Sequence, residues 1–515
     1  MIRVGIDVGG TNTDAVLIDE KKVAGAVKTP TTADITTGVK TALRDLLHET
    51  GRGDEVSAVM IGTTHFVNAV AQRRGLNKAA ALRICLPSGA SLRPTVDWPA
   101  DLADTVNGGT YLVAGGHEYD GRPLAPLDEA AIADAAQAMR TSGVTAAAIT
   151  AVFSPTTDEL ETRAAEILRQ EYPDLHITLS SRLGRIGLLE RENVALLNAA
   201  LTDLSTASVA ALEKAISDSG ITAPLYITQN DGTVASVKMA RQTPVFGIAS
   251  GPTNSMRGAA FLSGVEEAIV LDIGGTTSDI GCLVSGFPRE ANNVVEVSGV
   301  RTNFRMPDLL SIALGGGTVV DRNTLAIGPR SVGHRLTDEA MIFGGDTLTL
   351  TDVAVAQGLE GIGDPRCVAD LPRQTVEDVM VAVADRLAEA VDRMKKQAEP
   401  EPLLAVGGGA ILAPTKMPGI SEVVRIPHHG VANAVGAATA QVSGEVDRVF
   451  RNMSRDELLA TAEAMARHKA IEAGADPATL KTVEREDLPL AYLPGNAVRA
   501  RLRVVGDICR LRDGN

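Results

Sequence analysis

The feature that most constrains this chain is a short motif that occurs twice, far apart in the sequence. Residues 7–14 read DVGGTNTD and residues 272–279 read DIGGTTSD, so aspartate, two glycines, threonine and a second aspartate recur at matching positions. An apolar run precedes each copy and another follows it, which predicts a strand, a tight turn and a second strand. Glycine supplies the positive φ angle that such turns demand. Two copies this far apart indicate two homologous lobes rather than a short-period repeat.

The two turns predict phosphate binding, because backbone N–H groups with no side chain in the way bind phosphate oxygens. The residues concerned are Gly9, Gly10, Thr11 and Asn12 in the first turn, and Gly274, Gly275, Thr276 and Thr277 in the second. Asp7 and Asp272 stand just before the turns and could hold Mg²⁺ through water, since this ion keeps much of its hydration shell. Two such turns facing each other would clamp a triphosphate. A pair of ordinary hairpins with polar turns is the alternative.

Two later glycine clusters also follow apolar stretches. They comprise Gly315, Gly316 and Gly317, and then Gly407, Gly408 and Gly409. Each is typical of a strand that ends in a glycine turn, where a nucleotide can approach the backbone closely. A plain turn is again the alternative.

Strand-like and helix-like runs alternate along the rest of the chain, which predicts an α/β architecture. We expect one lobe over residues 1–187, a second over 188–442 and a small α+β extension over 443–515. Apolar side chains at helical spacing predict one long helix over 188–216 and another over 376–394. Residues 498–504 alternate apolar residues with arginine, as in a half-buried strand. Its arginine face could cover an acidic partner surface, or it could be a solvated edge strand.

Composition excludes several classes of protein. The chain has 49 Lys and Arg against 64 Asp and Glu, and this charge of −15 argues against nucleic acid or an anionic membrane as the main partner. Its four cysteines form no CxxC, and its eight histidines show no metal-binding spacing, so neither a disulfide framework nor catalytic zinc is indicated. No apolar run reaches about 18 residues and no signal peptide is evident, so we expect a cytoplasmic protein.

The paired turns and the late glycine cluster resemble the actin, hexokinase and heat-shock-chaperone ATPase superfamily. More narrowly, residues 2–442 resemble the hydantoinase A/oxoprolinase family, and GTTHFVNAVAQRRG (62–75) and GIASGPTNSMRGAA (247–260) are specific segments of this resemblance. Thr253, Asn254 and Ser255 depart from the alanine-rich stretch usual in the family.

The resemblance implies two duplicated actin/hexokinase-like, ribonuclease H-like lobes with a nucleotide cleft between them. It implies that the two turns bind phosphates, that residues 407–409 lie near adenosine, and that residues 315–317 lie near the phosphates or ribose. Thr63, Thr64 and Asn68 would line the cleft, or form a structural turn. His65 could act as an acid–base group or cap a helix.

The activity implied is ATP-dependent hydrolysis of a cyclic amide such as a hydantoin, a lactam or oxoproline. ATP and Mg²⁺ would be bound here, Asp7 and Asp272 would serve the metal and the chemistry, and a hydantoinase B-like or other second subunit would complete ring opening. Three alternatives stay open: a self-sufficient small-molecule kinase, a carboxylase ATPase subunit, and a non-hydrolase ATP-driven activator.

Overall fold

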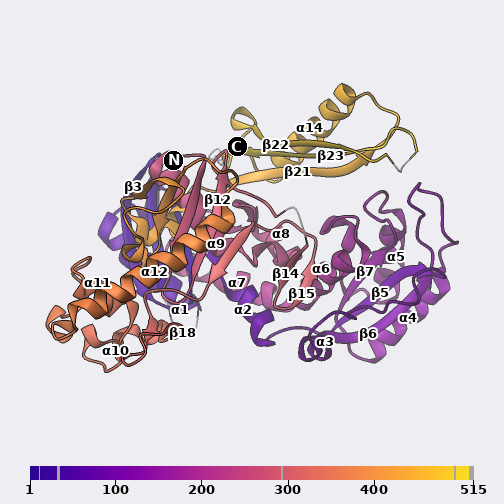
Figure 1. Cartoon of the computed structure of the whole chain (residues 1–515). Helices are drawn as coiled ribbons and strands as arrows, with labels where there is room; N and C mark the ends of the chain where they lie inside the picture. The colour runs from indigo at the N-terminus through magenta and orange to yellow at the C-terminus, as the bar shows by residue number, and fades with distance from the viewer. Residues whose placement is uncertain (11, 32–34, 292–293, 492–493, 510–515) are drawn as a thin grey trace.

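The computed structural model describes residues 1–10, 12–31, 35–291, 294–491 and 494–509 (Figure 1). Three larger sheets organise these residues, beside two sheets of two strands each. The largest has nine strands, the second is built on five strands with a sixth attached, and the third has four strands. Helices cover these sheets, and no single helix in the described part of the chain is long and apolar enough to cross a membrane. One bent pair of helices, Leu188–Ala200 with Thr202–Asp218, meets that length and composition test only when taken together.

The first lobe begins with an antiparallel hairpin. Strand β1 (Ile2–Val8) pairs antiparallel with β2 (Asn12–Asp19), which pairs with β3 (Lys22–Pro30). On its other side β1 runs parallel to β4 (Val56–Thr63), and β4 runs parallel to β9 (Leu225–Thr228). Helix α1 (Ile35–Thr50) packs on β2 and β3. The strand order is therefore β3-β2-β1-β4-β9.

The second lobe repeats this arrangement. Strand β11 (Ala268–Ile273) pairs antiparallel with β12 (Ser278–Val284) and parallel with β19 (Glu401–Val406), which is followed by the parallel strand β20 (Ile420–Arg425). Strands β13 (Phe287–Pro288) and β16 (Leu309–Ile312) take the place of β3 by pairing with β12. The same order and the same directions in both sheets confirm the duplicated α/β fold expected from the paired motifs.

A separate parallel sheet is inserted between β4 and β9. Its order is β6 (Asn107–Ala114), β5 (Ala79–Leu86), β7 (Ala146–Ala151) and β8 (His176–Leu179). Helices α4 (Glu129–Thr141) and α5 (Glu159–Glu171) share one hydrophobic core with this sheet, and α3 (Ala100–Val106) and α6 (Leu188–Ala200) share another. These elements lie together at one side of the molecule (Figure 1).

The single long helix expected over 188–216 is two helices. Helix α6 ends at Ala200, α7 (Thr202–Asp218) follows, and the two are bent by 50°. The physical reason is that the two halves belong to different cores. Val194 and Leu197 pack in the core beneath the inserted sheet, whereas Val209 and Leu212 pack in the core of the first lobe.

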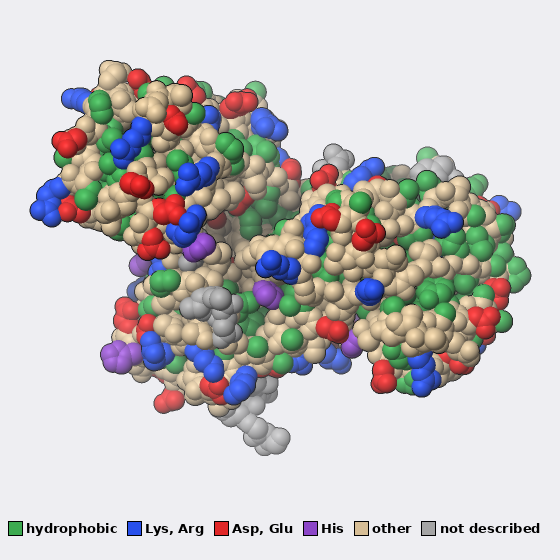
Figure 2. All heavy atoms as spheres, turned by 90° about the horizontal axis from the view of Figure 1, so that it is seen from below, with side chains coloured by type: hydrophobic (Ala, Val, Ile, Leu, Met, Phe, Trp, Pro, Cys, Tyr) green, Lys and Arg blue, Asp and Glu red, His purple; other side chains and the backbone are tan. Residues whose placement is uncertain are grey.

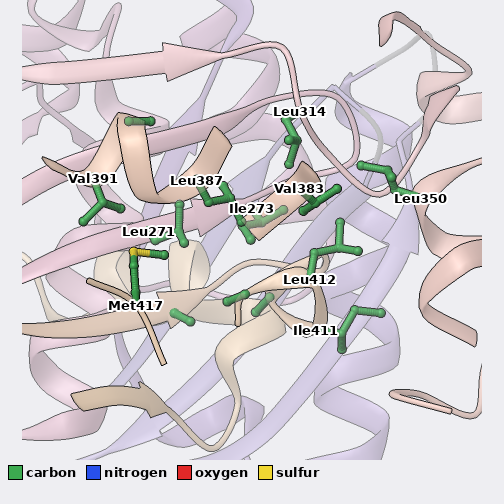
Figure 3. Packing of buried hydrophobic residues seen from close by; sticks show 14 of the residues in the cluster. Leu271, Ile273, Leu314, Leu350, Val383, Leu387, Val391, Ile411, Leu412 and Met417 are labelled. Atoms are coloured by element: carbon green, nitrogen blue, oxygen red, sulfur yellow. The ribbon is translucent and has the colours of Figure 1, made fainter. Parts of the chain in front are cut away.

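The helix expected over 376–394 is confirmed as α12 (Arg373–Met394). The residues predicted to share one face are all buried: Val376, Val379, Val383, Leu387, Val391 and Met394. They pack on β11 and β19 in the second lobe (Figure 3). Shorter elements lie beside this core, namely β17 (Thr318–Val320), β18 (Ile327–Ser331), α10 (Leu336–Glu339) and α11 (Leu350–Ala356).

The C-terminal residues extend the first sheet. Strand β21 (Gln441–Phe450) runs parallel to β10 (Thr233–Ser236), and β23 (Val498–Gly506) lies between β21 and β22 (Lys481–Pro489). Helix α14 (Arg455–Glu472) covers β21 and β23 and begins with the capping box of Ser454 and Glu457. The division at 187 and 442 stays a prediction, although β9, β10 and β21–β23 join the sheet of β1–β4.

The arginine-bearing strand is not an edge strand, because β22 pairs with its outer side. Arg501 and Arg503 are buried, with side chains 7% and 5% exposed. Arg501 contacts Glu290 and Glu484, and Arg503 lies 3.2 Å from the carboxylate of Asp231. The acidic surface that these arginines cover therefore belongs to the same chain.

Candidate functional site between the two hairpins

Asp7 and Asp272 occupy the same position in the two sheets. Asp7 lies opposite Asp14 on β2, and Asp272 lies opposite Asp279 on β12. Each aspartate is the last residue but one of its strand, so each carboxylate stands at the entrance to a glycine turn. Directly opposite residues on neighbouring strands point to the same face of a sheet. Each hairpin therefore presents a pair of carboxylates beside its turn.

Two further side chains join these aspartates. The Asn433 amide donates to Asp7 at 3.3 Å, and the Ser255 hydroxyl contacts both the Asp272 carboxylate and the Asn433 side-chain oxygen. The hydroxyl has one proton and donates to one of these oxygens at a time. The two hairpins of the duplicated fold are thus linked by an unbroken chain of polar contacts across the boundary between the lobes.

Close packing of two helices positions these linking residues. Ser255 lies on α9 (Ser250–Ser263) and Asn433 on α13 (Ala432–Thr439). A Cβ atom at Gly258 would strike the backbone of Ala432, and one at Gly436 would strike the backbone of Asn254. Only glycine allows this approach, because any side chain would push the helices apart. The helices therefore meet backbone to backbone, and this contact holds the polar link in place.

Burial and nearby carboxylates raise the pKa of both aspartates. The pKa of Asp7 rises to about 7, chiefly because the carboxyl is buried and also because Asp14 and Asp272 lie near. The pKa of Asp272 rises to about 6, again chiefly through burial, while the hydrogen bond from Ser255 opposes the rise. Carboxyl groups with shifted pKa values that converge at one place are typical of functional sites.

The glycine turns differ from the expectation in their conformation. Gly9 N–H donates to Asn12 C=O at 3.0 Å, and Gly274 N–H donates to Thr277 C=O at 2.9 Å. Each turn is thus closed by a hydrogen bond at the same position. None of Gly9, Gly10, Gly274 and Gly275 has a positive φ. Thr11 lies outside the described residues. In these turns the lack of a side chain, rather than an unusual backbone angle, is what glycine contributes.

Around the turns, Gly10, Thr276 and Thr277 are exposed, and Asn12 is half-buried. A Cβ atom at Gly10 would meet no atom within 4 Å. This edge of each turn is free for a ligand. A role for these residues in phosphate binding stays a prediction.

The second glycine cluster packs on the second turn. Gly316 N–H donates to Gly274 C=O at 2.9 Å, and Gly317 N–H donates to Gly275 C=O at 2.7 Å. A Cβ atom at Gly315 would lie 2.7 Å from the backbone nitrogen of Thr276. All three glycines of the cluster are buried. Their close approach is thus to another segment of the protein.

The third cluster packs on the same turn from another side. Gly409 N–H donates to Ile273 C=O at 2.7 Å, and a Cβ atom at Gly407 would strike the Asp272 carboxylate. Gly407 has a φ of +87°. Gly408 is exposed, and a Cβ atom there would meet no atom within 4 Å. Gly408 is therefore the member of this cluster that faces open space.

One hydrophobic core anchors these three segments of the second lobe. Ile273 precedes the second turn, Leu314 precedes Gly315, and Ile411 and Leu412 follow Gly409. All four are buried in the core that Val383 and Leu387 of α12 complete (Figure 3). Since close-packed cores have few low-energy arrangements, this packing fixes the three glycine segments relative to one another.

Residues 63–68 lie beside the first turn. Thr63 accepts a hydrogen bond at 3.1 Å from the backbone N–H of His65, the first residue of α2 (His65–Gln72). Thr64 is the N-cap residue, and its Oγ1 accepts a bond at 3.3 Å from the amide of Asn68. Thr64 also lies against Gly251 of α9. His65 is half-buried, which lowers its pKa, and its side chain does not cap the helix.

The residues present fit a magnesium ion held mainly through water. Asp7 Oδ1 is buried and has no hydrogen-bond partner, so this oxygen has unused capacity. Among the described residues, no group of three or more His, Cys, Asp or Glu side chains is placed to hold a metal ion directly. An ion that keeps several waters needs only one or two carboxylates, which Asp7 and Asp272 supply.

Sequence reasoning missed the residues that connect the site. No role was predicted for Ser255, Asn254, Gly62 or Asn433, although the first three lie in segments that resemble the family. The Asn254 amide donates to the Thr228 hydroxyl at 3.1 Å, and a Cβ at Gly62 would lie 2.9 Å from Asp7 Oδ1. A signal was present in the polar run of residues 253–255, which interrupts a stretch that is alanine-rich in the family that the sequence resembles.

The surface is hollowed between the rounded body at the upper left and the rest of the molecule (Figure 2). Two sheets of matching order, with glycine turns linked through Asp7 and Asp272, define a duplicated α/β protein. The chain belongs to the hydantoinase/oxoprolinase family. Its N-terminal region model matches residues 3–172, and the hydantoinase/oxoprolinase model matches residues 191–360.

Curated relatives match most of this chain at low identity. The alpha subunit of a caprolactamase from Pseudomonas jessenii is 25% identical over 409 residues, which cover 75% of this chain and 58% of the relative. The gamma subunit of acetophenone carboxylase from Aromatoleum aromaticum is 25% identical over 391 residues, which cover 69% of this chain and 53% of the relative. An uncharacterised Methanocaldococcus jannaschii protein is 24% identical over 426 residues, covering 76% and 62%. The chain thus spans between half and two thirds of these relatives.

Solved structures share the fold over nearly the whole chain. The ATP-dependent caprolactamase from Pseudomonas jessenii has a TM-score of 0.76 at 19% identity, and nucleotide-free acetone carboxylase has a TM-score of 0.68 at 18% identity. Each comparison covers 99% of this chain and 88% of the other.

Proposed function

We propose that this chain is the ATP-binding subunit of an ATP-dependent enzyme that hydrolyses a cyclic amide. The observation that carries the proposal is the link Asp7–Asn433–Ser255–Asp272, which joins the two glycine turns into one site. Membership of the hydantoinase/oxoprolinase family and the ATP-dependent caprolactamase among the structural neighbours support it.

The proposed step is transfer of the γ-phosphoryl group of ATP to the amide oxygen. The bond between the β,γ-bridging oxygen and the γ-phosphorus breaks, a bond from the amide oxygen to phosphorus forms, and ADP leaves. Water then adds to the activated carbon, and the ring C–N bond breaks as the nitrogen takes up a proton and leaves as an amine. The acyl phosphate that remains reacts with a second water to give the carboxylate and inorganic phosphate. An enzyme contributes to phosphoryl transfer chiefly by positioning and by charge stabilisation.

Each part of the site has a task in this proposal. The backbone N–H groups around Gly10 and Thr276 bind phosphate oxygens, and Gly408 leaves room for the nucleoside. Asp7 and Asp272 would hold Mg²⁺, which supplies charge neutralisation at the phosphates when bound. Ser255 and Asn433 hold the carboxylates of the two lobes in fixed positions relative to each other.

A partner subunit is part of the proposal. The caprolactamase and acetophenone carboxylase relatives are each described as one subunit of their enzyme. Ring opening of the activated amide is assigned here to a second chain of the hydantoinase B type.

A carboxylase ATPase subunit is the second candidate. It is favoured by the acetophenone carboxylase relative and by the fold shared with acetone carboxylase. In that case the same γ-phosphoryl transfer would activate a different oxygen.

The test is ADP release by the chain co-purified with its natural partner, measured against lactams, hydantoins, imides and aromatic or aliphatic ketones with bicarbonate. The proposal predicts that a cyclic amide accelerates ADP release and is opened, and that Asp272→Asn lowers the rate at least 100-fold while the fold is retained. Acceleration by a ketone with bicarbonate would favour the carboxylase. Turnover by the isolated chain with a stable phosphorylated product would favour a kinase.

A further inference from the structure

The third strand of the first lobe adds a cation to the site. Lys28 on β3 lies directly opposite Asp14 on β2, and Asp14 lies directly opposite Asp7 on β1. The Lys28 ammonium is 2.9 Å from Asp14 Oδ1 and 3.0 Å from Oδ2. Neighbouring strands are about 4.8 Å apart, so Lys28 is within about 10 Å of the Asp7 strand position. Its charge acts on the carboxyls of both Asp7 and Asp272.

The end of β3 also lies alongside the first glycine turn. Thr31 donates a hydrogen bond at 2.8 Å to the carbonyl of Gly9, and its hydroxyl is 3.2 Å from that of Thr13. Thr29 donates to the carbonyl of Thr13 at 3.2 Å. These bonds fix the strand that carries Lys28 against the turn, so the lysine has a defined position beside it.

The duplicated lobe lacks this cation. Asp279 is the counterpart of Asp14, and the residue opposite it on β16 is Ser311, which donates a hydrogen bond to Asp279. Each lobe therefore has three side chains opposite one another on neighbouring strands. The first two are carboxylates in both lobes, and the third is an ammonium in the first lobe and a hydroxyl in the second. The two halves of the site therefore differ in charge, although their folds are duplicated.

This asymmetry matters because the site is strongly acidic. Asp7, Asp14, Asp272 and Asp279 converge beside the two turns, and a polyphosphate brought to them would meet repulsion. An ammonium is a compact charge that binds phosphate oxygens well. The Lys28 side chain is 41% exposed, whereas that of Asp14 is 10% exposed, so the ammonium can turn from Asp14 toward a ligand without leaving water.

We propose that Lys28 binds the terminal phosphate of the nucleotide at the first turn, exchanging its ion pair with Asp14 for a bond to the ligand. The inference rests on the proposed function and adds an orientation to it: the transferable phosphoryl group faces the first lobe. Lys28 is then a binding residue for the γ-phosphate and not merely half of a cross-strand ion pair.

The test is calorimetric titration of the full chain with AMP, ADP and ATP in Mg²⁺. Lys28→Met is expected to weaken ATP binding at least tenfold, to weaken ADP binding less than threefold and to leave AMP binding unchanged. Lys28→Arg should restore at least part of the ATP affinity. Lys22→Met is the matched control, because Lys22 lies at the other end of β3 and is exposed. This variant should bind all three nucleotides like the wild type.

The outcomes separate this inference from the proposed function. If the wild type binds none of the three nucleotides, the proposed function fails. If the wild type binds ATP and Lys28→Met binds it equally well, only the role of Lys28 fails. Equal losses for AMP, ADP and ATP in Lys28→Met, together with a lowered melting temperature without nucleotide, would show a structural role and overturn the inference.

Discussion

At the scale of single residues, the glycines of this site are needed for two different reasons. Gly315, Gly407 and Gly409 are glycines because other parts of the chain approach them too closely for a side chain. Gly10 and Gly408 have open space where a side chain would be. Gly10 and Gly408 stand beside the linked aspartates, so the space there can take a ligand.

This distinction gives a clean mutational test. Gly408→Val should reduce Mg-ATP affinity at least tenfold, because the new side chain would occupy the space assigned to the nucleoside. The free energy of unfolding should change by less than about 0.5 kcal/mol, as for most exposed substitutions. Titration calorimetry and urea denaturation measure the two quantities.

Gly361→Val is the matched control, since a Cβ atom at Gly361 would also meet no atom within 4 Å and Gly361 has no positive φ. This variant should bind Mg-ATP like the wild type. Normal nucleotide affinity in Gly408→Val would show that this turn does not lie at the ligand.

At the scale of elements, the two hairpins concentrate carboxylates at the ends of β1 and β11. Helices α9 and α13 force this arrangement, because their backbones touch and bring Ser255 and Asn433 between the aspartates. The pKa of Asp7 rises to about 7 as a result of burial and of its acidic neighbours. Ionising Asp7 therefore adds a buried negative charge beside other carboxylates.

This charge predicts a pH-dependent stability. A carboxyl whose pKa is higher in the folded than in the unfolded protein destabilises the fold progressively as pH rises between the two values, here from about 4 to about 7. Asp7→Asn removes the charge. Relative to the wild type, the variant should gain on the order of 2–4 kcal/mol of unfolding free energy over this range and gain nothing further above pH 7.

Urea denaturation between pH 4.5 and 8.5, with a chelator and no nucleotide, measures this gain. The exposed carboxylate Asp54 provides the control, and Asp54→Asn should follow the wild type. Parallel curves for the wild type and Asp7→Asn would contradict the assigned burial of this charge.

At the scale of the whole molecule, buried ion pairs tie the C-terminal strands to the second lobe. Arg305 follows β15 (Val300–Thr302) and contacts Glu290 at 2.8 Å, Glu445 at 2.6 Å and Glu484 at 3.1 Å. Arg501 of β23 shares Glu290 and Glu484. The cluster thus joins β21, β22 and β23 to the segment between β13 and β16, and it stabilises one relative placement of these parts.

Removing one partner of this cluster should be costly. Arg501→Met leaves buried carboxylates with less compensation and is expected to destabilise the protein by about 3 kcal/mol. Arg455→Met breaks the Arg455–Asp487 pair, in which the arginine is 72% exposed, and should cost no more than about 1 kcal/mol. Urea denaturation of the two variants compares them directly, and equal effects would contradict a buried network.

The helix over 376–394 was predicted from a local pattern and is confirmed, whereas the positive φ expected of the glycine turns is not found. The buried face of α12 follows from apolar residues at helical spacing. Predictions that depended on neighbouring segments needed correction. The helix over 188–216 is divided between two cores, and β23 has a neighbour on each side.

The sequence by itself determined the duplication, because a repeated strand–glycine–strand motif acts through local backbone geometry and needs no distant partner. It also placed Asp7 and Asp272 at equivalent positions. Only the tertiary structure decided that Ser255 and Asn433 join these aspartates. It also decided that Lys28 lies opposite Asp14, the neighbour of Asp7. Residues separated by hundreds of positions meet here because α9 and α13 pack without side chains between them, and no local pattern encodes such a meeting.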